Sequence, residues 1–322
     1  MADVLVSQLY DRRQRLEKAA AALADPSLPA LLAEVDAALE RVQGGTYGLC
    51  QVCHDPIEPE RLMADPLTCF CLDHLTPAQR RDLQADLDVA QRVQSSLLPQ
   101  PEFAARGWRI ARHYEPAGVV SGDYCDFIPA SGGDSFFLIG DVSGKGVGAS
   151  LLMSHLHAIF RSLLSVGMPL SALMQQANRI FCESTLPTHY ATLVCGSAGA
   201  SGQVALVNAG HFPPVLVRGG GVSTFAATGL PIGLFCQSQY TAVSAGLRPG
   251  ESLVLYTDGV TEGRGPGGEE YGLERLCDVL ANSASLPAPA MVAAVLDDVR
   301  GFLGGRPKAD DLTVMVVERM SA

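Results

Sequence analysis

Basic residues are scarce in this chain of 322 residues, and few of its residues are charged at all. Lysine and arginine number 23 against 34 aspartates and glutamates, which gives a net charge of −11. A general nucleic-acid binder carries a basic surface, so this balance argues against direct nucleic-acid binding. Charged residues make up 18% of the chain and hydrophobic residues 48%, a composition that excludes wholesale disorder and supports a sizeable core.

Long apolar runs are also absent. No 18 consecutive residues are apolar, which argues against a transmembrane helix. Residues Met1–Val4 supply neither the basic start nor the apolar stretch of a secretion signal. Nine cysteines without such a signal indicate a reducing compartment, in which closely spaced cysteines bind metal rather than form disulfides. We therefore expect a cytoplasmic protein without a membrane partner.

The pattern along the chain predicts a small N-terminal module, a connecting helix and a large C-terminal domain. Residues 1–43 contain two sets of apolar residues at helical spacing, separated by prolines, and predict a helical hairpin. Residues 46–75 lack periodicity and hold four cysteines. Pro77 opens a helix that we expect to run to about Leu98. The predicted domains are therefore residues 1–75, a linker helix over 76–100, and residues 101–322.

The predicted linker helix carries a seam of mostly apolar residues spaced alternately by four and three. The seam consists of Leu83, Leu87, Ala90, Gln94 and Leu97. It covers only two heptads, fewer than a secure coiled coil needs. Two interpretations stay open at this point: the helix forms a homodimer through this seam, or it lies on its own domain.

From Trp108 onward, short apolar runs separated by glycine-rich turns predict strands, interspersed with helical periodicity. The expected strands are Arg109–Tyr114, Phe136–Val142, Ala191–Gly196, Val204–Asn208, Val215–Arg218, Ser252–Thr257 and Leu312–Val317. The expected helices are Gly148–Ser165, Leu170–Ser184, Gly272–Asn282 and Ala288–Leu303. Helices cluster instead of alternating strictly with strands, which favours an α+β fold with sheets flanked by helices.

A cluster of cysteines in the N-terminal module has the spacing of a zinc site. Cys50 and Cys53 are separated by two residues, as are Cys71 and His74, and seventeen residues lie between the pairs. Three thiolates and one imidazole fill the tetrahedral shell of one Zn²⁺, so we expect a structural ion. The cysteines without neighbours at such spacing are expected to be small buried hydrophobic residues: Cys182, Cys195, Cys236 and Cys277.

The residues around this cluster resemble the DksA/TraR-type zinc finger. The resemblance rests on Leu39–Cys53, then Pro56-Ile57, Arg61-Leu62 and Pro66. The family usually has cysteine where this chain has His74, and Cys69 and His54 flank the proposed ligands. A helical hairpin precedes the finger in the family too, and some members insert it into RNA polymerase through an acidic tip. The resemblance covers roughly the first quarter of the chain.

Aspartates beside small residues recur in the larger domain. They occur in Ser121–Asp126, Gly140–Gly146, Tyr256–Glu262 and Asp310–Thr313, and three of these segments lie at the edge of an expected strand. Carboxylates that converge from strand ends are how proteins hold hard divalent cations such as Mg²⁺ or Mn²⁺. An isolated Asp-Gly pair would indicate only a turn, but four such segments together favour a metal site.

The ordered set of aspartate segments resembles the PPM-type metal-dependent serine/threonine phosphatases, and most of all their SpoIIE-like bacterial branch. Further matching segments are Gln94–Pro99, Tyr114–Ala117, Asn208–Pro214 and Gly229–Gly233. The resemblance covers about residues 85–318. It implies an α-β-β-α sandwich in which two antiparallel sheets are flanked by helices.

The resemblance also implies site residues and chemistry. Asp141 would bridge two Mn²⁺ or Mg²⁺ ions with help from the Val142 carbonyl, Asp258 and Asp310 would complete the second site, and Asp123 would bind directly or through water. Asp126 and Asp311 are less certain ligands. Two cations about 3.5–4 Å apart would activate a water for attack on a phosphoserine or phosphothreonine. The general acid stays open between water, Ser143 and Lys145, and the family's phosphate-binding arginine has no counterpart.

The sequence leaves two functional hypotheses. The first is a metal-dependent protein phosphatase whose substrate, by family resemblance, is a phosphorylated STAS-type anti-anti-sigma factor, with the zinc module as a regulatory or docking domain. The second is a transcription-associated regulator that docks on RNA polymerase through its finger and keeps the phosphatase domain as a scaffold. The hairpin tip offers only Asp25 among prolines, and every expected ligand position in the large domain is still aspartate. Both facts favour the first hypothesis.

Overall fold

The computed structural model describes residues 28–75, 77–129, 134–186, 188–306, 308 and 310–321, together with residues 5, 6, 9, 10, 12–14, 16 and 17. These residues divide into two compact units, 1–86 and 87–322. Most of the first helix of the expected hairpin lies outside the described residues. The predicted domain boundaries at residues 75 and 100 stay a prediction. The boundary between the two compact units lies between them, after Asp86, inside a helix.

The N-terminal unit contains the second helix of the expected hairpin and a small finger. Helix α2 (Leu28–Gln43) ends at a pair of glycines, the second of which, Gly45, has a φ of +69°. The finger adds helix α3 (Pro59–Ala64) and the 3₁₀ turn η1 (Leu72–His74). Its small core is formed by Leu5, Ile57, Leu62 and two buried cysteines. So few apolar groups cannot stabilise a fold of this size, and a metal ion bound in the finger would supply the missing stability.

Helix α4 (Pro77–Leu97) runs across the boundary between the units. Within the C-terminal unit, Leu87, Ala90 and Leu97 are half-buried and Gln94 is buried. This part of the seam therefore lies on its own domain, which was one of the two interpretations. The side chains exposed on this part of the helix include Val89 and Val93.

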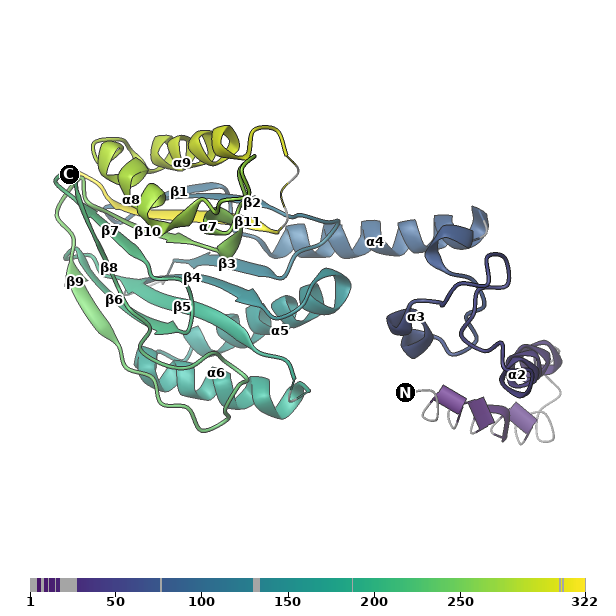
Figure 1. The fold of residues 1–322 in the computed structure, drawn as a ribbon. Coiled ribbons are helices and arrows are strands. Elements are labelled where there is room, and N and C mark those ends of the chain that lie inside the picture. The colour runs from purple at the N-terminus through teal and green to yellow at the C-terminus, as the bar shows by residue number, and fades with distance from the viewer. Residues whose placement is uncertain are drawn as a thin grey trace. The chain divides into compact units, whose positions relative to one another are not determined.

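The C-terminal unit is built on two antiparallel sheets (Figure 1). One sheet has six strands in the order β1 (Glu102–Ala105), β2 (Trp108–Glu115), β11 (Leu312–Arg319), β10 (Ser252–Tyr256), β7 (Val215–Arg218) and β8 (Gly221–Thr224). The other has five strands in the order β3 (Asp123–Ile128), β4 (Ser135–Val142), β5 (Ala191–Ala198), β6 (Gln203–Ala209) and β9 (Val243–Gly246).

Pairs of helices cover the outer faces of both sheets. Helices α5 (Gly146–Leu164) and α6 (Leu170–Ser184) pack on the five-stranded sheet, and α8 (Gly272–Asn282) and α9 (Ala288–Leu303) pack on the six-stranded sheet (Figure 1). A short helix, α7 (Asp258–Thr261), follows β10. The layers are α-β-β-α, as the sequence predicted.

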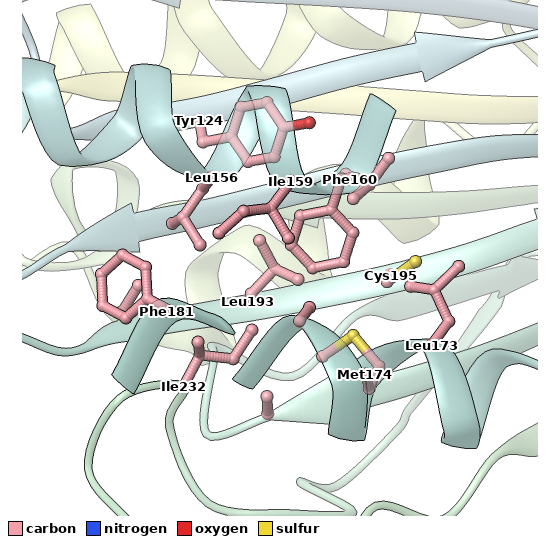
Figure 2. Close-up of a cluster of buried hydrophobic side chains, with 14 of the residues drawn as sticks. Tyr124, Leu156, Ile159, Phe160, Leu173, Met174, Phe181, Leu193, Cys195 and Ile232 are labelled. Atoms are coloured by element: carbon pink, nitrogen blue, oxygen red, sulfur yellow. The ribbon is translucent and has the colours of Figure 1, made fainter. Parts of the chain in front are cut away.

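Three apolar layers hold the sandwich together. Figure 2 shows the outer layer under α5 and α6, where Leu156 and Phe160 of α5 meet Phe181 of α6 and Leu193 of β5. A second outer layer lies under α8 and α9. The inner layer lies between the sheets and includes Phe137. Each fully buried side chain of this kind stabilises the fold by about 1.5–3 kcal/mol.

Helix α5 is long and apolar enough to cross a membrane by length and composition alone, and no other described helix passes this test. Seven of its residues are buried, and all of these except Ser150 are apolar. One face of α5 packs on the five-stranded sheet, which is the pattern of a core helix.

Helices with strong periodicity were predicted best. Helices α6, α8 and α9 and strand β7 have the expected bounds. Strands β1, β3, β8 and β9 and the short helices α3 and α7 were missed. Strand β3 carries two aspartates and follows a glycine, so no apolar run marks it. Two of the aspartates expected at strand edges lie just outside the strands: β10 stops at Tyr256 and Asp258 begins α7, and Asp310 precedes β11, which begins at Leu312.

Two cysteines expected to be isolated are bonded to each other. Cys182 of α6 and Cys236 form a disulfide across 54 residues, with their Cα atoms 5.7 Å apart. The loop that contains Cys236 is held against α6 by Asn178, which accepts from the Gly233 N–H and donates to the Phe235 carbonyl. The spacing along the sequence carries no trace of this contact. Cys195 is buried as expected, and Cys277 is half-buried.

Candidate active site

Alternation along β4 determines where Asp141 points. Phe137 and Ile139 belong to the layer between the sheets, whereas Leu138 faces the helices. Asp141 continues the inner face by two residues and reaches the end of the sandwich. Asp123, the first residue of β3, is its direct partner in the register of the two strands. The five-stranded sheet therefore supplies two carboxylates to one edge.

The six-stranded sheet supplies the other two carboxylates to the same edge. Asp258 follows β10 by two residues, and Asp310 precedes β11 by two residues. Because β10 and β11 are antiparallel neighbours, the end of the first and the start of the second lie together. All four aspartates expected to bind metal are thus brought to one end of the sandwich, two from each sheet.

Asp123 is buried and has one oxygen without a partner. Its Oδ2 accepts hydrogen bonds from the Thr257 hydroxyl at 2.9 Å and from the Thr313 hydroxyl at 2.5 Å, whereas Oδ1 is buried without any. Burial first, and then the charge of Asp141, raises the pKa of Asp123 well above its usual range. A buried carboxylate oxygen without a hydrogen bond is costly unless a cation or an ordered water lies beside it.

The other carboxylates disfavour one another's charge in the same way. Burial and then Asp258, Asp310 and Asp311 raise the pKa of Asp141 to about 7. Burial and then Asp310 raise the pKa of Asp258. Oxygen donors with several negative charges and too few positive partners suit hard divalent cations. The residues present therefore fit the Mn²⁺ or Mg²⁺ ions that were predicted.

Glycines beside the aspartates keep this edge open. A Cβ on Gly122 would stand 3.1 Å from the Val142 carbonyl oxygen and 3.3 Å from Asp141 Oδ1. A Cβ on Gly259 would overlap the Asp311 carbonyl. The Val142 carbonyl predicted to assist metal binding thus borders a space that only glycine leaves free.

The two less certain candidate ligands are engaged elsewhere. Asp126 faces the helices, on the opposite side of β3 from Asp123, and both its oxygens accept from the Arg161 guanidinium at 2.6 and 2.7 Å. The oxygens of Asp311 accept from the backbone N–H groups of Ala117 and Gly122 at 2.6 and 3.0 Å. Asp126 therefore joins β3 to α5, and Asp311 fixes the loop that leads into Asp123.

A pocket of about 350 Å³ opens beside the acidic edge. It is lined by Leu87 of α4, the loop 117–120, Lys145, Val147 and Asp310. The Lys145 ammonium lies 2.8 Å from Asp310 Oδ2 and is largely exposed. A cation beside the carboxylates and next to an open pocket is suited to an anionic group such as a phosphate.

The structure also brings the predicted zinc ligands together in the N-terminal unit. Cys50, Cys53, Cys71 and His74 place their ligand atoms within 4.8 Å of one another, and they form the one such group among the described residues. Cys71 Sγ lies 3.2 Å from His74 Nδ1. The flanking Cys69 lies outside this group. Three sulfurs and one imidazole nitrogen form a donor set suited to Zn²⁺.

Two known families match separate parts of the chain. A family described as stage II sporulation protein E (SpoIIE) matches residues 131–320, which is more than half of the chain. This chain belongs to the SpoIIE family. A second family, the prokaryotic DksA/TraR C4-type zinc finger, matches residues 45–73. The fourth proposed ligand of the finger, His74, follows Cys71 by three residues.

 The SpoIIE match lies within the C-terminal unit, and His74 stands directly after the last residue that the finger family matches.

Two curated relatives resemble a large part of the chain. Protein IcfG of Synechocystis is 30% identical over 268 residues, which are 73% of this chain and 41% of that protein. The phosphoserine phosphatase RsbP of Bacillus subtilis is 25% identical over 240 residues, which are 72% of this chain and 57% of that protein. The chain thus spans about half the length of these relatives.

Solved structures share the fold of the C-terminal unit. The SiaA-PP2C domain of Pseudomonas aeruginosa has a TM-score of 0.65 at 21% identity and covers 76% of this chain and 98% of its own. The RsbU and RsbW domains of Rv1364c from Mycobacterium tuberculosis have a TM-score of 0.58 at 27% identity, over 69% of this chain and 62% of theirs. The catalytic domain of the phosphatase PstP, solved with two manganese ions, has a TM-score of 0.50 at 14% identity and covers 66% of this chain and 99% of its own.

The polar residues that hold the aspartates in place were not predicted from the sequence. Thr257 and Thr313 fix Asp123 across the two sheets, and Gln94 of α4 holds the backbone of Ser121, two residues before Asp123. Thr257 and Thr313 stood inside the quoted aspartate segments, so their positions carried a signal. The role of Gln94 was hidden, because a polar residue in a heptad seam suggests a helix partner rather than a loop.

Proposed function

We propose that this protein is a metal-dependent serine/threonine phosphatase that acts on phosphorylated proteins. The observation that carries the proposal is the convergence of four aspartates, two from each sheet, at one edge of the sandwich, where one oxygen of Asp123 is buried without a hydrogen-bond partner. Membership of the SpoIIE family and the likeness to the phosphoserine phosphatase RsbP support it.

Asp123, Asp141, Asp258 and Asp310, with the Val142 carbonyl, would hold two divalent cations. When bound, these cations would supply Lewis-acid activation of the attacking water and neutralise charge on the phosphoryl oxygens. The chain's own groups prepare this site. Thr257 and Thr313 hold one Asp123 oxygen so that the other stays available, and the Lys145 ammonium stands at the pocket where a phosphate would enter.

The surroundings of the acidic edge support a protein as the substrate. Large apolar side chains are exposed on three segments that meet near it: Val147, Leu151, Leu186, Tyr190, Leu230, Leu234 and Phe235. The segments are joined to the site by backbone pairing, since Tyr190 pairs with Ser143 and Ala191 with Ile232. Residues 219–247 contain no Asp, Glu, Lys or Arg. We call these seven residues the apolar rim, and such an exposed patch is typical of a protein-binding surface.

The substrate class we propose is a phosphorylated STAS-type anti-anti-sigma protein, in a cytoplasmic partner-switching pathway. The likeness to a chain that contains both an RsbU and an RsbW domain supports this assignment. The zinc finger would serve as a regulatory or docking module, since its four ligands leave no open coordination position for catalysis.

Hydrolysis of p-nitrophenyl phosphate tests the phosphatase assignment. The full-length wild type should hydrolyse it only with Mn²⁺ or Mg²⁺, and Asp141→Asn should reduce kcat by roughly a thousandfold, because a cation ligand is lost. Asp297→Asn, an exposed aspartate of α9, is the matched control and should keep the wild-type rate. Equal background rates in all three proteins would contradict the proposal and favour a scaffold role.

A further inference from the structure

His211 is a buried histidine with both ring nitrogens engaged. Its Nδ1 lies 2.8 Å from the Thr192 hydroxyl, and its Nε2 lies 3.1 Å from the Tyr256 carbonyl oxygen. A carbonyl only accepts, so Nε2 carries the proton and Nδ1 accepts from the hydroxyl of Thr192. Burial lowers the pKa of His211 to about 4, which keeps the ring neutral.

The backbone of His211 is fixed as firmly as its ring. Asn208, near the end of β6, accepts from the His211 N–H through Oδ1 at 2.8 Å and donates to the His211 carbonyl from Nδ2 at 3.1 Å. The imidazole therefore has one position available to it. A side chain held at both ends in this way can set the distance between the two groups that it bridges.

Those two groups belong to different sheets, and each stands beside a proposed metal ligand. Thr192 of β5 is the direct strand partner of Asp141. Tyr256 ends β10, two residues before Asp258. The residue between them, Thr257, donates to Asp123. His211 thus ties the half of the acidic edge on the five-stranded sheet to the half on the six-stranded sheet.

We propose that His211 is a positioning residue that fixes the separation of the two halves of the metal site, through Thr192 on one side and the Tyr256 carbonyl on the other. It touches neither a metal nor a phosphate, because both its nitrogens are used within the protein. Its contribution is to the affinity for the cations, and this inference rests on the proposed function. Partners that orient metal ligands in this way typically affect metal affinity by about 10–100-fold.

Two variants test the bridge from its two ends. Thr192→Val removes the hydroxyl and leaves the imidazole in place, and His211→Phe removes both hydrogen bonds while keeping an aromatic ring. The restoring variant is Thr192→Ser, which keeps the hydroxyl. Calorimetric titration of the zinc-loaded full chain with Mn²⁺ should show at least roughly tenfold weaker binding in the first two and wild-type affinity in the third.

The matched control is a second hydrogen bond between the sheets, far from the aspartates. Trp108 at the start of β2 donates from Nε1 to the Gly199 carbonyl, just after β5, at 2.9 Å. Trp108→Phe should lower the Tm without changing the Mn²⁺ affinity, because it removes a link between the sheets at the opposite ends of these strands. A structural role alone would make Thr192→Val behave like this control.

The outcomes separate the inference from the function on which it rests. Mn²⁺ affinity within twofold of wild type in Thr192→Val overturns the role of His211, whatever happens to the Tm. If His211→Phe does not fold, Thr192→Val and Thr192→Ser decide the matter. Failure of the wild type to bind Mn²⁺ would contradict the proposed function itself, and the inference with it.

Discussion

At the scale of single residues, the site is a group of carboxylates held in place by neutral donors. Asp123 illustrates this best: the hydroxyls of Thr257 and Thr313 occupy one of its oxygens, and nothing in the described structure occupies the other. Each unsatisfied buried polar atom costs about 1–3 kcal/mol. The aspartates therefore destabilise the fold unless cations are present, and this leads to a prediction about pH.

The metal-free protein should become less stable as the pH rises. Burial, followed by Asp258, Asp310 and Asp311, raises the pKa of Asp141 to about 7, whereas an aspartate in an unfolded chain titrates at about 4. Because the folded state binds this proton more tightly, the associated stability is present below pH ~4 and is lost as the pH rises to ~7. Thermal unfolding without divalent cations should show this loss of stability as a Tm that falls as the pH rises.

Two comparisons isolate the contribution of Asp141 from that of other titrating groups. Asp141→Asn should show a smaller loss of Tm between about pH 5 and pH 8 than the wild type, because the carboxyl group with the raised pKa is absent. Addition of Mn²⁺ at the higher pH should restore the Tm of the wild type only. Identical pH dependence in both metal-free proteins would contradict the account of this residue.

At the scale of secondary-structure elements, the linker helix is fastened to the loop before the first aspartate. The Gln94 side chain donates to the Ser121 carbonyl at 2.7 Å and accepts from the Ser121 N–H at 3.0 Å. The next residue, Gly122, is held by Asp311. The position of α4 is thus connected to the position of Asp123 through a backbone that is hydrogen-bonded on both sides.

Replacing Gln94 should weaken this attachment. Gln94→Leu removes two buried hydrogen bonds and leaves two backbone groups without partners, so we expect the free energy of unfolding to fall by about 2 kcal/mol. The value of kcat for p-nitrophenyl phosphate should fall as well, because the loop that positions Asp123 is loosened. Gln91→Leu, on the exposed side of the same helix, is the control. Equal behaviour of the two variants in urea unfolding and in kinetics would refute this role.

The apolar rim is the second element-scale feature with a testable role. Phe235→Ser and Leu151→Ser should each lower kcat/KM for a phosphorylated STAS-domain protein by roughly tenfold while leaving p-nitrophenyl phosphate hydrolysis unchanged, as expected when a buried apolar contact worth about 1–3 kcal/mol is lost. Val166→Ser, an exposed residue just beyond the other end of α5, should change neither rate. A parallel loss with both substrates would show that the rim shapes the catalytic edge instead.

At the scale of the whole molecule, the sequence predicted the kinds of metal site and the regular helices better than the contacts between distant segments. The aspartate and cysteine segments pointed to two kinds of metal site, and strongly periodic helices such as α6 and α9 were found with their bounds. What could not be predicted were contacts between distant segments, such as the Cys182–Cys236 disulfide, the Asp126–Arg161 pair and the bridge through His211. These depend on how helices and loops pack, and local patterns do not record that packing.

Because the finger and the phosphatase domain are separate compact units, their metals should be separable. Cys71→Ser should abolish zinc binding and unfold residues 46–75, because zinc supplies about 10 kcal/mol or more to such fingers. The unfolding transition of the C-terminal unit should be unchanged. Zinc content per chain and hydrogen exchange measure both effects. Cys69→Ser is the control, and loss of zinc in that variant with retention in Cys71→Ser would reverse the ligand assignment.

Each sheet contributes half of one proposed catalytic metal site. The most direct test is the Mn²⁺ dependence of phosphate release from a phosphoserine peptide, compared between wild type, Asp141→Asn and Asp258→Asn. We expect a saturable Mn²⁺ requirement in the wild type and loss of activity in both variants, one from each sheet. Activity that survives in Asp258→Asn, or that needs no divalent cation, would contradict it.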